Sequence, residues 1–86
     1  MVNYIRINFE EKWKNAELPY MTSRYIRTKA TPKRMQTSIE RARKFAETLE
    51  VKESDGKPFT RTLKTIELDD GLSRTVMWKS EDKEEE

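Results

Sequence analysis

The chain has 86 residues, of which 40% are charged and only 34% are hydrophobic, and its net charge is +2. A chain of this length forms one domain with a small core, to which a homodimer or another partner would add buried area. It contains no cysteine and no histidine, which excludes disulfides, thiolate metal sites and histidine-based catalysis or zinc binding. No apolar run approaches the ~18 residues of a membrane span, and the first residues hold no signal-peptide segment, so we expect a cytoplasmic protein.

The first part of the chain predicts two strands. Residues 3–9 alternate between apolar and polar side chains, as a half-buried strand does. Residues 10–18 are mostly polar and predict a loop or a short helical turn that ends before Pro19, because the residue before a proline avoids the helical region. Residues 20–28 are rich in aromatic and β-branched residues, which are typical of a strand.

An amphipathic helix follows these strands. Thr31 can cap the helix N-terminus with its hydroxyl, and Pro32 suits the first turn, where its missing N–H costs nothing. We expect the helix to end at Leu49 or Glu50. Apolar residues at spacings of three and four form one stripe along it: Met35, Ile39, Ala42, Phe45, Ala46 and Leu49. This stripe is the surface expected to pack on the rest of the core.

The last part of the chain predicts a turn over residues 52–58 and then two strands, residues 59–68 and 72–80. Glycine and proline near the end of the turn stop the helix from continuing. A hairpin with an Asp70-Gly71 loop joins the two strands, because this dipeptide favours a tight hairpin turn.

Two registers of this hairpin are consistent with the sequence. A two-residue loop pairs Glu67 with Arg74, and a three-residue loop pairs Leu68 with Leu72. We expect the first, because it places opposite charges across the strands.

The order of elements is therefore β-β-α-β-β. It predicts an α+β fold, with one helix packed on a mostly antiparallel sheet. Residues 1–80 are expected to form this single domain, and residues 81–86 to form an acidic, disordered tail. Trp78 is expected in the core, whereas Trp13 fits either the core or an interface.

The sequence contains no catalytic constellation, and we expect no enzyme. Without histidine, a nucleophile would need a lysine or a carboxylate as its base. Both glycines fall in turns, so there is no phosphate-binding loop, and no cofactor or metal is expected. The neighbouring acids Glu10 and Glu11 are typical of a solvated face rather than of a catalytic pair.

Positive charge is concentrated in the middle of the chain. Residues 24–44 hold eight cations against one acid, whereas residues 45–86 hold twelve acids against seven cations. Arginine and tyrosine side chains on one face could hold phosphates and stack on bases. The candidate binding residues are seven cations and one tyrosine: Arg24, Tyr25, Arg27, Lys29, Lys33, Arg34, Arg41 and Lys44.

The charges of the helix oppose its dipole. Lys33 and Arg34 fall in the first turn, where the dipole disfavours cations by about 0.3–1 kcal/mol each. Glu47 and Glu50 lie at the other end, where acids are disfavoured. Charges placed against a local rule suggest a binding role, and free N–H groups beside two cations suit a phosphate or a carboxylate.

Three interpretations of the basic block follow. The first is a small regulatory protein that binds DNA or RNA through this strand–helix surface. The second is an inhibitor of the kind used by phages or other mobile elements, which docks on an acidic surface of a host enzyme, including one that handles nucleic acid. In another form of this hypothesis, the acidic hairpin and tail occupy a basic nucleic-acid channel of the target. The third is that the cations meet the acidic second half across the fold or form an ordinary solvated face. One exposed basic patch would favour the first two over the third.

Overall fold

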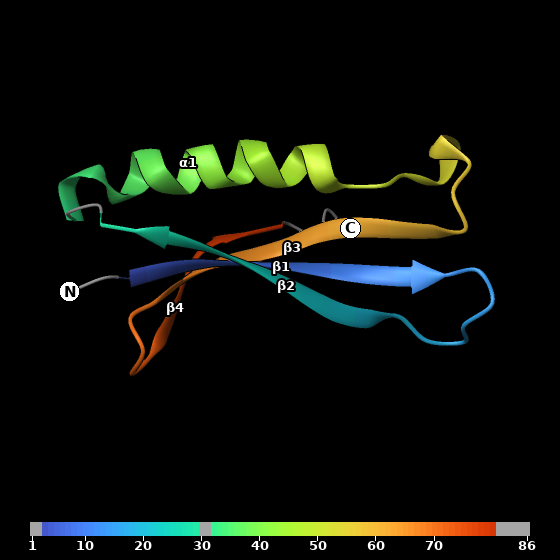
Figure 1. Ribbon diagram of the computed structural model, residues 1–86, viewed down its shortest axis with the longest axis horizontal. Coiled ribbons are helices and arrows are strands. Elements are labelled where there is room, and N and C mark those ends of the chain that lie inside the picture. The colour runs from blue at the N-terminus through green and yellow to red at the C-terminus, as the bar shows by residue number, and fades with distance from the viewer. Residues whose placement is uncertain (1–2, 30–31, 81–86) are drawn as a thin grey trace.

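The computed structural model describes residues 3–29 and 32–80, except for the side chains of residues 32 and 33. The five main elements are β1 (Asn3–Trp13), β2 (Tyr20–Thr28), α1 (Pro32–Leu49), β3 (Phe59–Asp69) and β4 (Arg74–Lys79), and a short 3-10 helix, η1 (Glu53–Asp55), precedes β3. The strands pair antiparallel in the order β2-β1-β3-β4, and α1 lies on one face of this sheet (Figure 1). The α+β fold and the element order β-β-α-β-β are thus confirmed.

The two elements in the middle of the sequence, β2 and α1, have the bounds that the sequence predicts. β2 spans Tyr20–Thr28, and α1 begins at Pro32 and ends at Leu49. The predicted cap Thr31 and the predicted tail, residues 81–86, lie outside the described residues. The described part of the chain holds no helix with the length and apolar character to cross a membrane.

The core lies between α1 and the two middle strands. Residues of the helix stripe meet the inward side chains of β1 and β3, and the contact between helix and sheet is thin. The buried hydrophobic residues are Ile5, Ile7, Phe9, Met35, Ile39, Ala42, Ala46, Leu63 and Ile66. Phe45 was predicted in this stripe, but its side chain is 49% exposed. It lies at the margin of the stripe, beyond the part of the helix surface that packs on the sheet.

Two bulges change which side chains face the helix. The register between β1 and β3 shifts so that Lys64 is an extra residue in β3. Leu63 and Ile66 can therefore both point into the core, although strict alternation would place residues three apart on opposite faces. A similar shift makes Met77 the extra residue of β4 and puts Trp78 opposite the buried Ile66.

β1 extends four residues beyond its predicted end, so the loop or turn predicted over residues 10–13 is wrong. Glu11 is 7% exposed, and its carboxylate accepts hydrogen bonds from Trp13 Nε1 at 2.8 Å, Tyr20 Oη at 2.9 Å and Arg61 Nε at 3.1 Å. Burial acts to raise the pKa of Glu11, but these three donors outweigh it and hold the pKa below its ordinary value. The sheet can therefore include this polar stretch, because its buried acid has partners.

Both tryptophans are half-buried. Trp78 packs against the core cluster, which supports its predicted place there. Trp13 stacks on Phe59 with ring centroids 4.7 Å apart, so an aromatic pair joins the end of β1 to the start of β3.

A four-residue loop joins β3 to β4 and pairs Asp69 with Arg74, so both predicted hairpin registers are wrong. The carboxylate of Asp70 accepts hydrogen bonds from the backbone N–H groups of Leu72 and Ser73, both at 2.9 Å. These backbone hydrogen bonds hold the pKa of Asp70 below its ordinary value. An aspartate that caps its own turn in this way stabilises a longer loop than the two-residue alternative.

Candidate functional site

Seven of the eight predicted binding residues are described by the structure, and all seven are exposed. They are Arg24, Tyr25, Arg27, Lys29, Arg34, Arg41 and Lys44. The side chain of the eighth, Lys33, lies outside the described residues. They come from β2, from the segment that follows it, and from α1. Those of β2, Lys29, Arg34 and Arg41 lie around the β2 edge of the sheet, whereas Lys44, two residues from the buried Ala42 and Ala46, is on the outer side of the helix.

The sheet divides the residues of β2 between its two faces. Arg24 lies opposite Ile7, which is fully buried under α1, so Arg24 is on the helix side of the edge. Tyr25 and Arg27 are on the other side, which we call the open face because α1 does not cover it (Figure 1). Because β2 is an edge strand, Arg24 on the helix side and Arg27 on the open face both lie along the same exposed edge of the sheet.

The flank of α1 that faces β2 is basic. A groove of about 330 Å³ separates this flank from β2, and its lining includes Ser38, Arg41 and Phe45 of the helix and Ile26 and Thr28 of the strand. Arg34 is seven residues before Arg41, which places it on the same side of the helix two turns earlier. Phe45, which the sequence pattern predicted in the core, instead adds an exposed ring to this groove.

The flank that faces β4 has a different character. A second groove, of about 590 Å³, is lined there by Glu40 and Arg43 together with apolar side chains that include Met77 and Trp78. Arg43 makes an ion pair with Glu47 at 2.9 Å, so this side of the helix holds its own countercharges. Arg34 and Arg41 lie on the other flank, whereas Lys44 is four residues after Glu40 and three before Glu47, which places it beside both acids.

The acids of the sheet are paired with cations that lie outside the predicted set. The ion pairs are Glu67 with Arg6, Glu11 with Arg61, Glu10 with Lys64 and Asp69 with Arg74. Among the described residues, no ion pair involves Arg24, Arg27, Lys29, Arg34, Arg41 or Lys44. Of the acids predicted to neutralise the basic block across the fold, those in the sheet are thus engaged elsewhere.

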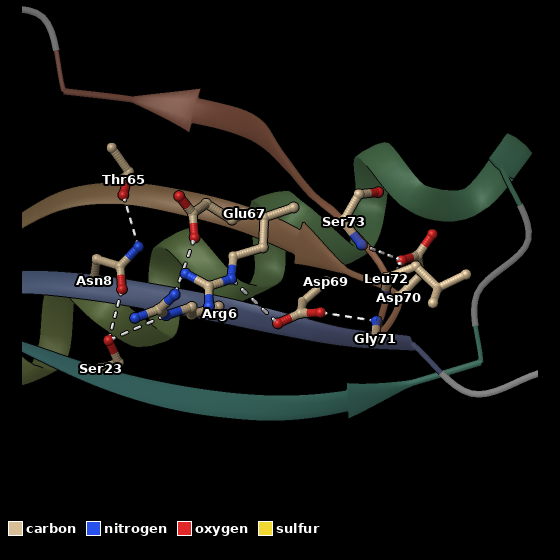
Figure 2. A network of polar contacts seen from close by, with 11 residues as sticks. Arg6, Asn8, Ser23, Thr65, Glu67, Asp69, Asp70, Gly71, Leu72 and Ser73 are labelled. Carbon is tan, nitrogen blue, oxygen red and sulfur yellow. Dashed lines mark hydrogen bonds and ion pairs between the residues drawn. The ribbon is translucent and has the colours of Figure 1, made fainter.

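A chain of polar contacts crosses the open face from β2 to β3 (Figure 2). Arg6 Nε donates to Ser23 Oγ at 3.3 Å, and the Ser23 hydroxyl donates to Asn8 Oδ1 at 2.6 Å. Asn8 Nδ2 donates in turn to Thr65 Oγ1 at 2.9 Å. Arg6 also approaches Glu67, with Nη1 and Oε1 3.8 Å apart. This network holds the guanidinium of Arg6 in place on the face.

Two tyrosines lie beside this network. Tyr4 and Tyr25 are 42% and 53% exposed, and their rings meet edge to face with centroids 6.3 Å apart. The guanidinium carbon of Arg6 lies 5.8 Å from the ring centroid of Tyr25. Tyr4 and Arg6 were not among the predicted binding residues, although the alternation of residues 3–9 places both on the polar side of β1.

Glu10 and Glu11 do not form a joint acidic site, because consecutive strand residues point to opposite faces. Glu10 pairs with Lys64 near solvent, whereas Glu11 is buried, which corrects the expectation that both are solvated. In the described part of the chain, no group of acidic side chains could hold a metal ion. Comparisons of this chain with protein-family models, with curated proteins and with solved structures found no match.

Proposed function

We propose that this is a small non-enzymatic regulatory protein that binds nucleic acid through the cations around β2. The surface, which we call the β2–α1 basic surface, consists of Arg24, Arg27, Lys29, Arg34, Arg41 and Lys44. The observation that carries the proposal is the distribution of ion pairs. These six cations are exposed and make no ion pair among the described residues, while the acids of the sheet pair with other cations.

Unpaired surface cations are what a phosphate backbone requires. Each phosphate that a lysine or arginine neutralises releases condensed counterions, and this release supplies most of the free energy of non-specific binding. Cations already held in ion pairs would have to break those pairs first. The β2–α1 basic surface therefore offers its charge at little cost.

The aromatic rings beside the cations favour nucleic acid over an acidic protein surface. Tyr25 and Arg27 lie on the same face of β2, and Tyr4 lies opposite Arg27 on β1. Carboxylates need only the cations, whereas a nucleic acid uses cations for its phosphates and rings for its bases. An acidic protein target thus leaves the exposed tyrosines without a role.

A titration of fluorescently labelled DNA and RNA by anisotropy at about 50 mM salt tests the proposal. Wild-type protein should bind. The double variant Arg34→Ala, Arg41→Ala should bind more weakly by roughly 10-fold, because two phosphate contacts are lost. Lys52→Ala, Lys57→Ala is the matched control, since it removes the same charge from exposed positions in the turn before β3.

The control variant should bind like the wild type, and unchanged far-UV circular dichroism should show that every variant folds. Polyglutamate added as a competitor separates recognition of nucleic acid from charge alone. Loss of all binding to DNA and RNA at low salt would refute the proposal. Displacement by polyglutamate at an equal concentration of charge would instead favour an acidic protein as the target.

A further inference from the structure

We infer that the open face of the sheet binds single-stranded nucleic acid, with bases stacked on Tyr4 and Tyr25 and the backbone held along β2. This inference rests on the proposed function and deepens it, because it names the form of nucleic acid and the residues that select it. It adds Tyr4 and Arg6 to the interface. It assigns base stacking to the tyrosines and phosphate binding to the cations of β2.

Four side chains form a checkered block at one corner of this face, where the start of β1 pairs with the end of β2. Tyr4 lies opposite Arg27 across β1 and β2, and Arg6 lies opposite Tyr25. Antiparallel partners point to the same face, so two rings and two guanidinium groups alternate at the spacing of neighbouring strands. Such an alternation offers stacking surfaces and countercharges side by side, which is what an unpaired strand with exposed bases requires.

The rings are exposed but not loose. Tyr4 and Tyr25 support each other edge to face, and Arg6 lies over Tyr25. Arg6 is fixed in turn by Ser23 and Glu67 (Figure 2). A pre-ordered platform loses less side-chain entropy when a base stacks on it than a mobile ring does.

The two cations of the block have different charge environments. Arg6 is compensated by Glu67, so its main part is to position Tyr25 and to present a flat guanidinium plane. Arg27 makes no ion pair among the described residues, and with Lys29 it borders a shallow pocket at the end of β2. Phosphates would therefore lie beside Arg27 and Lys29 at the end of β2, and bases on the rings of Tyr4 and Tyr25.

The polar groups of the network lie next to the rings. The side chains of Asn8, Ser23 and Thr65 cross the face just beyond Arg6. Asn8 is only 8% exposed and its amide is already hydrogen-bonded at both ends, so only the half-buried hydroxyls of Ser23 and Thr65 are near a stacked base, and base preference should be weak. The acids of the face are Glu10 on β1 and Glu67 and Asp69 on β3, and each is paired with a cation, which reduces their repulsion of a phosphate.

A duplex cannot use this platform. Its bases are stacked on each other inside the helix, and their faces are not accessible to a tyrosine on the surface of a sheet. Only a strand whose bases are free to turn outward can place them on Tyr4 and Tyr25. The structure therefore favours single strands over duplexes of the same sequence.

The test compares four labelled oligonucleotides at one salt concentration: single-stranded DNA, single-stranded RNA, the matching DNA duplex, and a single strand with abasic sites in place of its bases. Single strands should bind more tightly than the duplex and the abasic strand. Tyr4→Leu and Tyr25→Leu should each weaken single-strand binding on the order of 10-fold. Tyr4→Phe and Tyr25→Phe keep the ring and should retain affinity.

Each outcome bears on one of the two proposals. If the leucine variants fold and bind single strands like the wild type, or if the abasic strand binds as tightly as the normal one, stacking is refuted. Binding that still depends on Arg34 and Arg41 would then leave charge-driven nucleic-acid binding in place. If no nucleic acid binds at all, both proposals fail. Upfield shifts of the Tyr4 and Tyr25 ring protons in NMR spectra on adding a single strand would support stacking directly.

Discussion

Substitution of Glu11 by alanine should cost a large share of the protein's stability. Glu11 is 7% exposed and accepts hydrogen bonds from three side chains, and the side chain of its ion-pair partner Arg61 is only 18% exposed. Removing one member of a buried ion pair typically costs about 3–5 kcal/mol, because the other charge stays buried. Arg61 keeps a hydrogen bond to the Leu49 carbonyl oxygen at 3.0 Å, so we expect about 2–4 kcal/mol.

That loss is about half of the total for a domain this small, whose free energy of unfolding should be about 4–8 kcal/mol. Urea denaturation followed by far-UV circular dichroism measures it, and the melting temperature should fall by at least about 10 °C. Glu10→Ala is the matched control, because the neighbouring pair with Lys64 is solvent-exposed and worth at most about 1 kcal/mol. A loss below about 1 kcal/mol for Glu11→Ala would refute the reasoning, since it would mean that the buried charge of Arg61 needs no partner.

Three further predictions concern stability. Because the folded-state pKa of Glu11 lies below its unfolded value of about 4.5, its stabilisation is complete above that pH and is lost as the pH falls through the folded pKa. Urea midpoints at pH 7 and about pH 3.5 should thus differ less in Glu11→Gln than in the wild type. Ile39→Ala should cost about 2–4 kcal/mol, whereas Phe45→Ala should cost under about 1 kcal/mol, because only Ile39 is buried; urea unfolding of both variants checks this. Gly71→Ala should lose about 1 kcal/mol in the same assay, because Gly71 has φ of +91°; an unchanged midpoint would show that the loop relaxes.

The fold was predictable wherever one local pattern decides the structure. The composition of residues 20–28 and the stripe of residues 31–49 predicted β2 and α1 with their observed bounds. The end of β1 was not predictable, because Glu11 enters the sheet only when Tyr20 and Arg61, distant in sequence, supply donors. Local polarity there favours a loop, and tertiary contacts override it.

A bulge and a capped loop explain why the predicted hairpin register was wrong. The hairpin register depends on the extra residue Met77 and on a loop capped by Asp70, and neither has a signature in the alternation of the strands.

Phe45 was predicted in the core because its spacing fits the stripe. The sheet meets only a narrow part of the helix, and spacing alone does not give the width of that contact.

The candidate site was predictable in its composition but not in its arrangement. Clustering of charge along the chain identified the cations, since these residues are adjacent in sequence. Tyr4 and Arg6 were missed because they come from β1 and join Tyr25 and Arg27 only through the pairing of β1 with β2. The ion pairs of the acids likewise depend on which strands become neighbours.

The salt dependence of binding tests the central claim most directly, that the unpaired cations around β2 neutralise phosphates. The measurement is the slope of log K against log salt for a single-stranded oligonucleotide, compared between the wild type and the triple variant Arg27→Ala, Arg34→Ala, Arg41→Ala. We predict a steep slope for the wild type and a slope shallower by about 2 for the variant, since each phosphate contact on a single strand contributes about 0.7. Equal slopes for the two proteins, or no binding by the wild type, would contradict the claim.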